Sequence, residues 1–215
     1  MDIAAIIPAY NEAKTIGSVL TVLTGCHRID EIIVVSDGST DNTAEIARQF
    51  AGVAVVELPE NRGKGAAMKA GMEHTDAEIV LFLDADLIGL TEAHIDNLLE
   101  PVLQDRVMMT LGLFEKGRVA TDLAQKVAPH LTGQRALQRD LFSGLSDLDL
   151  TRFGAEVALH RYVEEHQIPV ALVSLTDLSH LMKEEKLGLW KGLAARGKMY
   201  WEIIKYAANI DLNLK

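Results

Sequence analysis

The sequence predicts an α/β protein with a mostly parallel central sheet flanked by helices, and three observations lead to this prediction. Short apolar runs typical of buried strands recur through the first 86 residues, amphipathic segments of helical period lie between them, and the connecting turns are rich in Gly, Asn and Asp. Strands that alternate with helices form right-handed βαβ units, and these place the strands parallel in one sheet.

The expected elements follow in order along the chain. Strands are expected at 2–8, 31–36, 53–58, 79–83, 107–114 and 170–175, and helices at 12–23, 43–50, 65–74, 91–103, 121–131 and 155–165. Pro8 is expected to stop the first strand. Because no repeat or low-complexity linker interrupts the pattern, residues 1–182 are expected to form one Rossmann-like domain with two halves, 1–90 and 91–182.

The bulk composition excludes several classes of protein. The 215 residues are 48% hydrophobic and 24% charged, which is ordinary for a soluble globular protein, and the net charge of −10 argues against a nucleic-acid partner. A single cysteine, Cys26, rules out an internal disulfide and fits a reducing compartment. No signal peptide is recognised, and no apolar run approaches the roughly 20 residues that span a bilayer. The sequence therefore predicts a cytoplasmic protein.

Residues 183–215 form a basic tail of helical period on this acidic chain. The tail has seven Lys/Arg against four Asp/Glu, and its lysines 191, 198 and 205 recur every seven residues beside a stripe that contains Trp190 and Trp201. One interpretation is a peripheral helix on an anionic membrane. The other is a helix packed on its own domain or on a second subunit of a homodimer, which Gly192 and Gly197 favour because they weaken a free-standing helix.

The segment IVLFLDADL, residues 79–87, joins an apolar strand to two carboxylates. Asp84 and Asp86 follow the strand with Ala85 between them. Open α/β sheets bind ligands at this end of their strands, and paired carboxylates suit Mg²⁺ or Mn²⁺ carrying a diphosphate. Taken alone, two solvated aspartates in a turn explain the segment equally well.

Three other strands are followed by loops with polar chemistry. After the first, Asn11 and Glu12 stand where a helix begins, and helix capping is the preferred role of Asn11. After the second, Asp37 is expected to be free to accept hydrogen bonds from a base or a ribose. After the third, NRGKG places Lys64 between glycines at a helix N-terminus, which suits a phosphate. Together the four loops predict a nucleotide-diphosphate site.

The motifs PAYNE, SDGSTDNT, NRGKG and LDADL, in this order, resemble the family 2 glycosyltransferases of GT-A fold. The resemblance covers residues 3 to about 90 strongly and continues more loosely to about 186. It implies a sugar donor that is most often UDP-linked, a Mg²⁺ or Mn²⁺ ion, and a donor-binding first half with an acceptor-binding second half. The metal would neutralise the leaving diphosphate. The donor contacts that it implies are Pro8, Tyr10, Glu12, Asp37, Lys64, Asp84 and Ala85, with Asp86 as the direct metal ligand and a catalytic residue.

The resemblance extends to candidates in the second half. Glu156 would be the acceptor-side catalytic carboxylate, either as general base or as a holder of a sugar hydroxyl, and its other interpretation is a favourable charge in a first helical turn. His180 would complete the metal site, whereas the remaining six histidines are expected at the surface. The residues assigned to acceptor binding are Thr132, Gly133, Gln134 and Arg135, and those assigned to phosphate are Lys183 and Lys186, whose other interpretation is a solvated charge run.

Two subtypes and three other classes remain as alternatives. The acceptor is either a small phosphorylated acid, as in the retaining glucosyl-3-phosphoglycerate synthase-like enzymes, or a polyprenyl or dolichyl phosphate, whose transferases typically carry DDSSPD where this chain has SDGSTD. A nucleotidyltransferase would have a glycine-rich first loop with Arg and Lys, an inactive binding protein would more plausibly have lost Asp86 or Glu156, and a Rossmann oxidoreductase would carry G-x-G-x-x-G. The sugar, the acceptor, the stereochemistry and the oligomeric state stay open.

Overall fold

The structure is a computed structural model that describes residues 1–115, 132–143, 145 and 154–180. The chain divides into two compact units, Met1–Ser179 and His180–Lys215. The expected helix at 121–131 and the basic tail with Lys183 and Lys186 lie outside the described residues.

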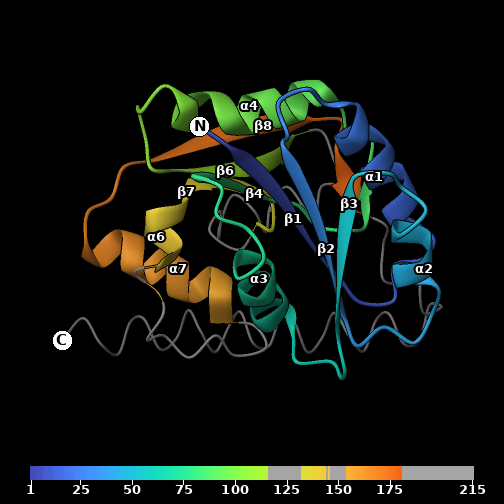
Figure 1. Cartoon of the computed structure of the whole chain (residues 1–215). Coiled ribbons are helices and arrows are strands. Elements are labelled where there is room, and N and C mark those ends of the chain that lie inside the picture. Colours follow the sequence, from blue (N-terminus) through green and yellow to red (C-terminus); the bar gives the residue numbers. More distant parts are fainter. Residues whose placement is uncertain (116–131, 144, 146–153, 181–215) are drawn as a thin grey trace. The chain divides into compact units, whose positions relative to one another are not determined.

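A seven-stranded sheet forms the centre of the first unit, with the strand order β3-β2-β1-β4-β7-β6-β8 (Figure 1). Only β7 runs antiparallel to its neighbours, which confirms the prediction of an α/β fold with a mostly parallel sheet. A separate two-stranded sheet joins β5 (Leu87–Ile88) and β9 (Ser179–His180). The seven strands are β1 (Ile3–Ala9), β2 (Glu31–Asp37), β3 (Val53–Leu58), β4 (Ile79–Phe82), β6 (Met109–Glu115), β7 (Arg135–Gln138) and β8 (Val170–Thr176).

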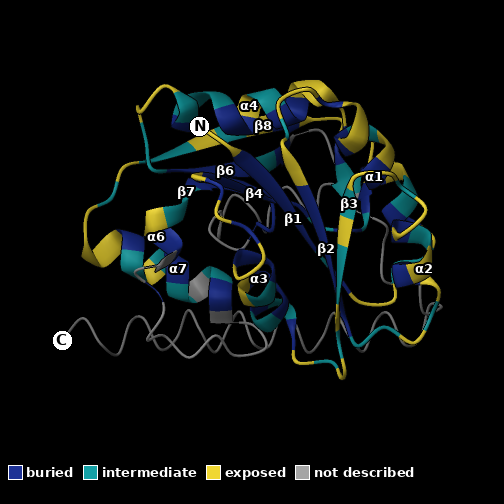
Figure 2. Ribbon diagram, viewed as in Figure 1, coloured by how far each residue is buried: buried dark blue, intermediate teal, exposed yellow. Residues whose placement is uncertain are grey.

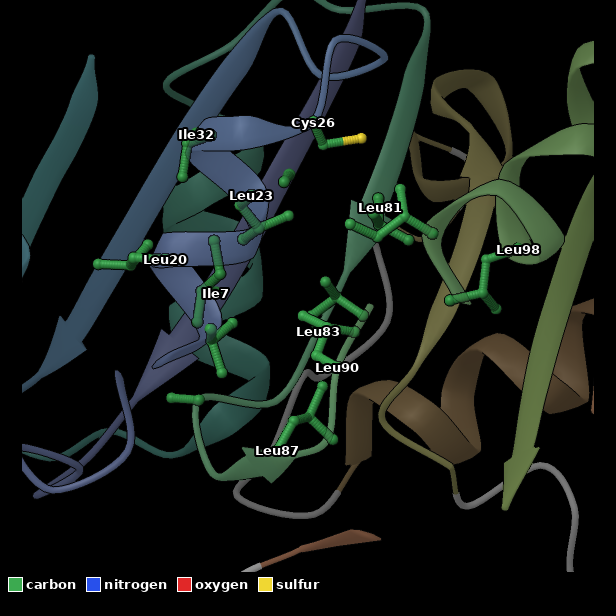
Figure 3. Packing of buried hydrophobic residues seen from close by; sticks show 14 of the residues in the cluster. Ile7, Leu20, Leu23, Cys26, Ile32, Leu81, Leu83, Leu87, Leu90 and Leu98 are labelled. Carbon is green, nitrogen blue, oxygen red and sulfur yellow. The ribbon is translucent and has the colours of Figure 1, made fainter. Parts of the chain in front are cut away.

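Helices cover both faces of this sheet, which is why the central strands have no polar side (Figures 1 and 2). In β4, Leu81 packs into the core beneath α1 and α4, and Phe82 packs into the core on the opposite face. Figure 3 shows part of the first core, to which α1 contributes Leu20 and Leu23, β4 contributes Leu81 and α4 contributes Leu98. One face carries α1 (Ile16–Gly25), α2 (Thr43–Ala47) and α4 (Glu92–Leu103), and the other carries α3 (Lys64–Met72), α6 (Arg139–Ser143) and α7 (Gly154–Glu165).

The structure corrects the expectation that Pro8 stops the first strand. β1 continues to Ala9, and Pro8 itself pairs with Val35 of β2. On its other side β1 pairs with β4 only as far as Ile6. The missing N–H of Pro8 therefore falls where β1 has a neighbour on one side only, and the proline is tolerated there.

His94 is not a surface residue, contrary to the expectation for the histidines outside the site. Its side chain is only 7% exposed. Nδ1 accepts the Thr91 N–H at 3.2 Å, and Nε2 lies 2.9 Å from the Thr176 carbonyl oxygen, to which it donates. The imidazole thus caps the start of α4 and ties it to the end of β8.

The strand order reverses beside β1. From β1 the chain moves outward through β2 to β3 and then returns to β4 on the other side of β1. The loops that follow β1 and β4 therefore diverge at the carboxyl edge of the sheet, and open α/β sheets bind their ligands at such a point. Among the helices that the structure describes, none combines the length and the apolarity needed to cross a membrane.

Candidate active site

Lys64 joins two carboxylates from distant parts of the chain. Its Nζ lies 2.5 Å from Oδ1 of Asp84 and 2.7 Å from Oε1 of Glu156. Lys64 opens α3, Asp84 follows β4, and Glu156 lies in the first turn of α7. The ammonium thus connects a residue predicted for the donor side with one predicted for the acceptor side.

The three side chains are mostly shielded from water, with exposed fractions of 31% for Lys64, 20% for Asp84 and 18% for Glu156. Burial alone would lower the pKa of Lys64, but the Asp84 and Glu156 carboxylates outweigh that effect and raise the pKa above its ordinary value. Lys64 is therefore a fixed positive charge at any physiological pH, which is the property that a diphosphate requires of its partner.

The segment assigned to acceptor binding is buried in the structure, and its contact with an acceptor stays a prediction. Thr132, Gln134 and Arg135 are at most 3% exposed. The Gln134 Nε2 donates to Oδ2 of Asp84 at 2.7 Å, and a Cβ added to Gly133 would overlap both carboxylate oxygens of Asp84. The segment therefore packs directly against the carboxylate of Asp84 and holds it by a hydrogen bond.

Arg135 is a second buried cation at this site. Its guanidinium is 1% exposed and donates to the Thr132 carbonyl oxygen. Burial lowers the pKa of Arg135, while the nearby Glu156 and Asp84 carboxylates act in the opposite direction. Because a guanidinium keeps its proton under all ordinary conditions, Lys64 and Arg135 together balance the two carboxylates.

The sequence predicts that Asp37 is free at its strand tip, but in the structure its carboxylate is already hydrogen-bonded. Its Oδ1 accepts the Arg62 N–H and its Oδ2 accepts the Gly63 N–H, both at 2.8 Å. The carboxylate therefore fastens the loop that leads into Lys64. Gly38 supports the same contact, because its φ is +64° and a Cβ there would collide with the backbone of residues 60 and 61. A direct contact between Asp37 and a base stays a prediction, and it would use the remaining lone pairs of these oxygens.

Asn11 links two loops and does not cap a helix, which corrects its preferred role. It adopts a positive φ of 57°, its Oδ1 accepts the Thr40 N–H at 2.8 Å, and its own N–H donates to Ser39 Oγ at 3.1 Å. The backbone N–H groups of Glu12 and Ala13 likewise bond to Thr43 and Asp41. The only sequence signal for this linkage is the cluster of short polar residues in SDGSTDNT, which favours such side chain to backbone bonds.

These four hydrogen bonds fix the loop that carries Tyr10 and Glu12. Tyr10 is 46% exposed, so a large part of its ring is available to a ligand, and Glu12 accepts from the Thr15 hydroxyl at 3.2 Å. Pro8 and Ala85 lie at the ends of neighbouring strands, with Ala85 buried. The structure thus gathers the residues predicted for donor binding at one edge of the sheet. Their contacts with a bound donor stay predictions.

The carboxylates that could hold a metal ion are Asp84 and Asp86, which suit a hard cation such as Mg²⁺ or Mn²⁺. Within the described ranges, no three His, Cys, Asp or Glu side chains cluster closely enough to bind an ion by themselves. This arrangement fits an ion held by one or two carboxylates together with water and phosphate oxygens. The side chain of His180 is outside the described part of the chain, so its role as a ligand stays a prediction.

Fold and site arrangement define a domain of the GT-A type, with its polar loops at the switch point of a mostly parallel sheet. Residues 4–161 match the family Glycosyl transferase family 2. The chain belongs to this family, as its motifs predicted.

Two relatives illustrate the similarity in sequence. Over 124 residues the chain is 34% identical to the glucosyl-3-phosphoglycerate synthase of Mycolicibacterium smegmatis, covering 53% of this chain and 41% of that protein. Over 94 residues it is 44% identical to a dolichyl-phosphate beta-glucosyltransferase of Trichomonas vaginalis, covering 38% of this chain and 28% of that protein. The matched segments thus span less than half of the length of these relatives.

A solved structure extends the similarity to most of the fold. Glucosyl-3-phosphoglycerate synthase from Mycobacterium tuberculosis, in complex with Mn²⁺, uridine-diphosphate-glucose and phosphoglyceric acid, is 28% identical to this chain with a TM-score of 0.70. The alignment covers 84% of this chain and 71% of that one.

Proposed function

We propose that this domain transfers a sugar from a UDP-sugar to a phosphate-bearing acceptor, with Mg²⁺ or Mn²⁺ as cofactor. The observation that carries the proposal is the Lys64 ammonium between Asp84 and Glu156 at the switch point of the sheet. A fixed cation beside an Asp-x-Asp sequence is what a nucleotide diphosphate and its metal require. The M. tuberculosis synthase, with Mn²⁺ and uridine-diphosphate-glucose bound, supports the same donor class.

Each loop at the carboxyl edge has a proposed part in donor binding. The exposed ring of Tyr10, with Pro8 and Glu12 beside it, receives the base. Asp37 sets the loop that presents Lys64 to the diphosphate. Asp84 and Ala85 then lie beside the ribose.

The Asp-x-Asp segment is the proposed metal site. Asp86 ligates the ion directly, Asp84 lies next to it, and His180 adds a nitrogen ligand. When bound, the ion supplies charge neutralisation at the leaving diphosphate as the sugar C1–O bond breaks. Lys64 adds a second positive charge to the same leaving group and needs no reorganisation to do so.

Glu156 has its proposed role on the acceptor side. Through Lys64 its carboxylate is already tied to the donor side, 2.7 Å from the ammonium. In an inverting enzyme Glu156 would take the proton of the acceptor hydroxyl, and in a retaining enzyme it would hold a sugar hydroxyl. The anomeric configuration of the product, read by proton NMR, decides between these roles.

The acceptor we propose first is a small phosphorylated acid. The supporting observation is that the synthase structure with phosphoglyceric acid aligns over 84% of this chain. The second candidate is a polyprenyl or dolichyl phosphate, favoured by the 44% identity to the dolichyl-phosphate transferase. Incubation with labelled UDP-glucose and either acceptor separates the two, because only the lipid product moves into an organic phase.

For the cellular setting we propose a cytoplasmic protein whose tail, residues 183–215, packs on its own domain or on a second copy of the chain. Attachment of the tail to anionic lipid is the alternative. Co-sedimentation of the full chain with anionic vesicles, lost on deletion of residues 187–215, would favour the lipid and contradict the packing.

Calorimetric titration of UDP, GDP and ADP, with Mn²⁺ and with EDTA, tests the donor and the metal together. We expect UDP to bind most tightly and to need the metal. Asp86→Ala is expected to remove the metal-dependent part of the UDP affinity without changing the unfolding temperature. A preference for GDP would shift the donor to a GDP-sugar, and absence of binding by all three nucleotides would overturn the proposal.

The Asn11 linkage predicts a graded effect on donor binding. Asn11→Gly keeps the positive φ but loses the acceptor for the Thr40 N–H, and we expect about fivefold weaker UDP binding in Mn²⁺. Asn11→Asp keeps an oxygen at that position and should bind UDP as the wild type does. Calorimetry with both variants checks this, and equal affinities of Asn11→Gly and wild type would show that the linkage does not position the loop.

A further inference from the structure

We infer that Thr132 and Gln134 are positioning residues that hold the Asp84 carboxylate in one orientation for the donor. They do so through a relay of hydrogen bonds that runs from the Thr132 hydroxyl through the Gln134 amide to Asp84, whose other carboxylate oxygen accepts from Lys64. The inference rests on the proposed function, since it assigns Asp84 to the donor side. The acceptor-binding role that the sequence predicted for these two residues stays a separate prediction.

The first link of the relay is the amide of Gln134. Its Nε2 lies 2.7 Å from Oδ2 of Asp84, while Oδ1 of the same carboxylate accepts from Lys64 at 2.5 Å. Both oxygens of Asp84 are thus engaged, one by Gln134 and the other by Lys64, which restricts the rotation of the carboxylate. An ionised carboxylate only accepts hydrogen bonds, so the amide must present its NH₂ group to Asp84 and its oxygen to the other side.

The second link is the hydroxyl of Thr132, which lies on that other side. Its Oγ1 is 2.9 Å from Oε1 of Gln134 and 2.7 Å from the carbonyl oxygen of Gly112 in β6. A hydroxyl has one hydrogen, so Thr132 donates to one of these two oxygens at a time. When it donates to Gln134, it satisfies the amide oxygen and keeps the NH₂ group turned toward Asp84.

Gln134 is closely packed by its surroundings. Its side chain is fully buried, and a Cβ added to Gly112 would already lie 3.2 Å from the Gln134 Cβ. Because Gly133 has no Cβ, the carboxylate of Asp84 can lie directly against the backbone of Gly133. The backbone of Gln134 is tied to β6 by the Gly112 N–H, which donates to its carbonyl oxygen at 2.9 Å. Its side-chain amide then holds one oxygen of Asp84, while Lys64 holds the other.

The alternative is that these polar groups only stabilise the fold, and neighbouring Thr110 offers the matched control. Thr110 is equally buried in β6, and its Oγ1 donates to the Leu98 carbonyl oxygen at 2.7 Å and accepts the Ala136 N–H at 3.2 Å. It resembles Thr132 in burial and bonding, but its hydroxyl forms hydrogen bonds with Leu98 and Ala136 and with neither Asp84 nor Gln134. Removal of its hydroxyl therefore measures the cost of a buried threonine without the relay.

The experiment measures UDP affinity by calorimetry in Mn²⁺ and in EDTA, and the unfolding temperature of each variant. Gln134→Met removes the amide at similar size, and we expect UDP to bind about tenfold more weakly in Mn²⁺. Thr132→Val is expected to weaken binding about threefold to tenfold, whereas Thr132→Ser keeps the hydroxyl and restores the wild-type affinity. The double variant Thr132→Val/Gln134→Met should bind no more weakly than Gln134→Met alone, because Thr132 acts through Gln134. Thr110→Val should lower the unfolding temperature like Thr132→Val and leave the UDP affinity unchanged.

Each outcome decides the inference separately from the proposed function. If the wild type itself does not bind UDP in Mn²⁺, the proposed function fails. If the wild type binds and Thr132→Val and Gln134→Met bind equally well, the function stands and the positioning role is wrong. If both variants fail to fold while Thr110→Val folds, the pair is structural and the inference is overturned.

Discussion

Replacement of Lys64 by methionine is expected to lower the free energy of unfolding by about 3 kcal/mol at neutral pH and to abolish UDP binding. Methionine fills a similar volume but leaves Asp84 and Glu156 facing each other without the ammonium that lies 2.5 and 2.7 Å from them. We place the value at the low end for a broken buried pair because all three side chains keep some exposure to water. Urea denaturation followed by circular dichroism gives the stability, and calorimetry gives the binding.

A second substitution separates the charge effect from lost packing. Glu156→Gln removes one of the two carboxylates, so in the Lys64→Met background it should recover part of the lost stability, whereas in the wild type it should reduce it. Strictly additive effects of the two substitutions would show that the ammonium does not hold the carboxylates together. Lys64→Arg keeps the charge and is expected to be more stable than Lys64→Met.

The difference in unfolding free energy between wild type and Lys64→Met has a defined dependence on pH. The carboxylates raise the pKa of Lys64, so the stability that the ion pairs contribute is fully present below the unfolded value of about 10.5 and is lost as pH rises through the higher folded value. The difference in unfolding free energy between wild type and Lys64→Met should therefore be the same at pH 7 and pH 9. A difference that already shrinks between these two pH values would contradict the raised pKa.

The parallel part of the fold follows from local sequence, but the antiparallel strand does not. β1, β2 and β4 are apolar runs because helices cover both of their faces, and each run is visible in the sequence. β7 is only four residues long and begins with Arg135, a residue type that is rarely buried. The carboxylates of Glu156 and Asp84, which favour the charged form of Arg135, approach it only in the folded chain.

In the candidate site, too, the sequence motifs identify the loops, whereas the contacts between loops arise only in the folded chain. Four motifs identify the loops that follow the strands, and these loops do meet at one edge of the sheet. However, Lys64 and Glu156 are 92 positions apart, and they meet because α3 and α7 share one hydrophobic core. The sequence predicts a helix cap for Asn11 and a ligand contact for Asp37, whereas their hydrogen bonds in the structure go to neighbouring loops. Local patterns predict capping and exposure, and they carry no information on such cross-loop partners.

Replacement of Gly133 by alanine is expected to weaken UDP binding in Mn²⁺ by at least roughly 100-fold, at a cost in stability of only about 1–3 kcal/mol. The added Cβ would overlap the carboxylate of Asp84 and lie 2.5 Å from Nζ of Lys64, so both groups must leave their present positions. Gly133 is not among the glycines of positive φ, so alanine fits the backbone there and the effect arises from the site alone. Calorimetric titration of UDP, with the unfolding temperature measured alongside, checks both parts.

Two comparisons make the Gly133 result interpretable. Gly17 lies in α1, where an added Cβ would meet nothing nearer than 3.8 Å, and Gly17→Ala should leave UDP binding unchanged. Because the two nearest overlaps at Gly133 are with the carboxylate oxygens of Asp84, Gly133→Ala should cost less stability in an Asp84→Ala background than in the wild type. Wild-type UDP affinity in Gly133→Ala would mean that Asp84 and Lys64 can move without loss of donor binding, and the close packing of Gly133 against them would then have no part in the site.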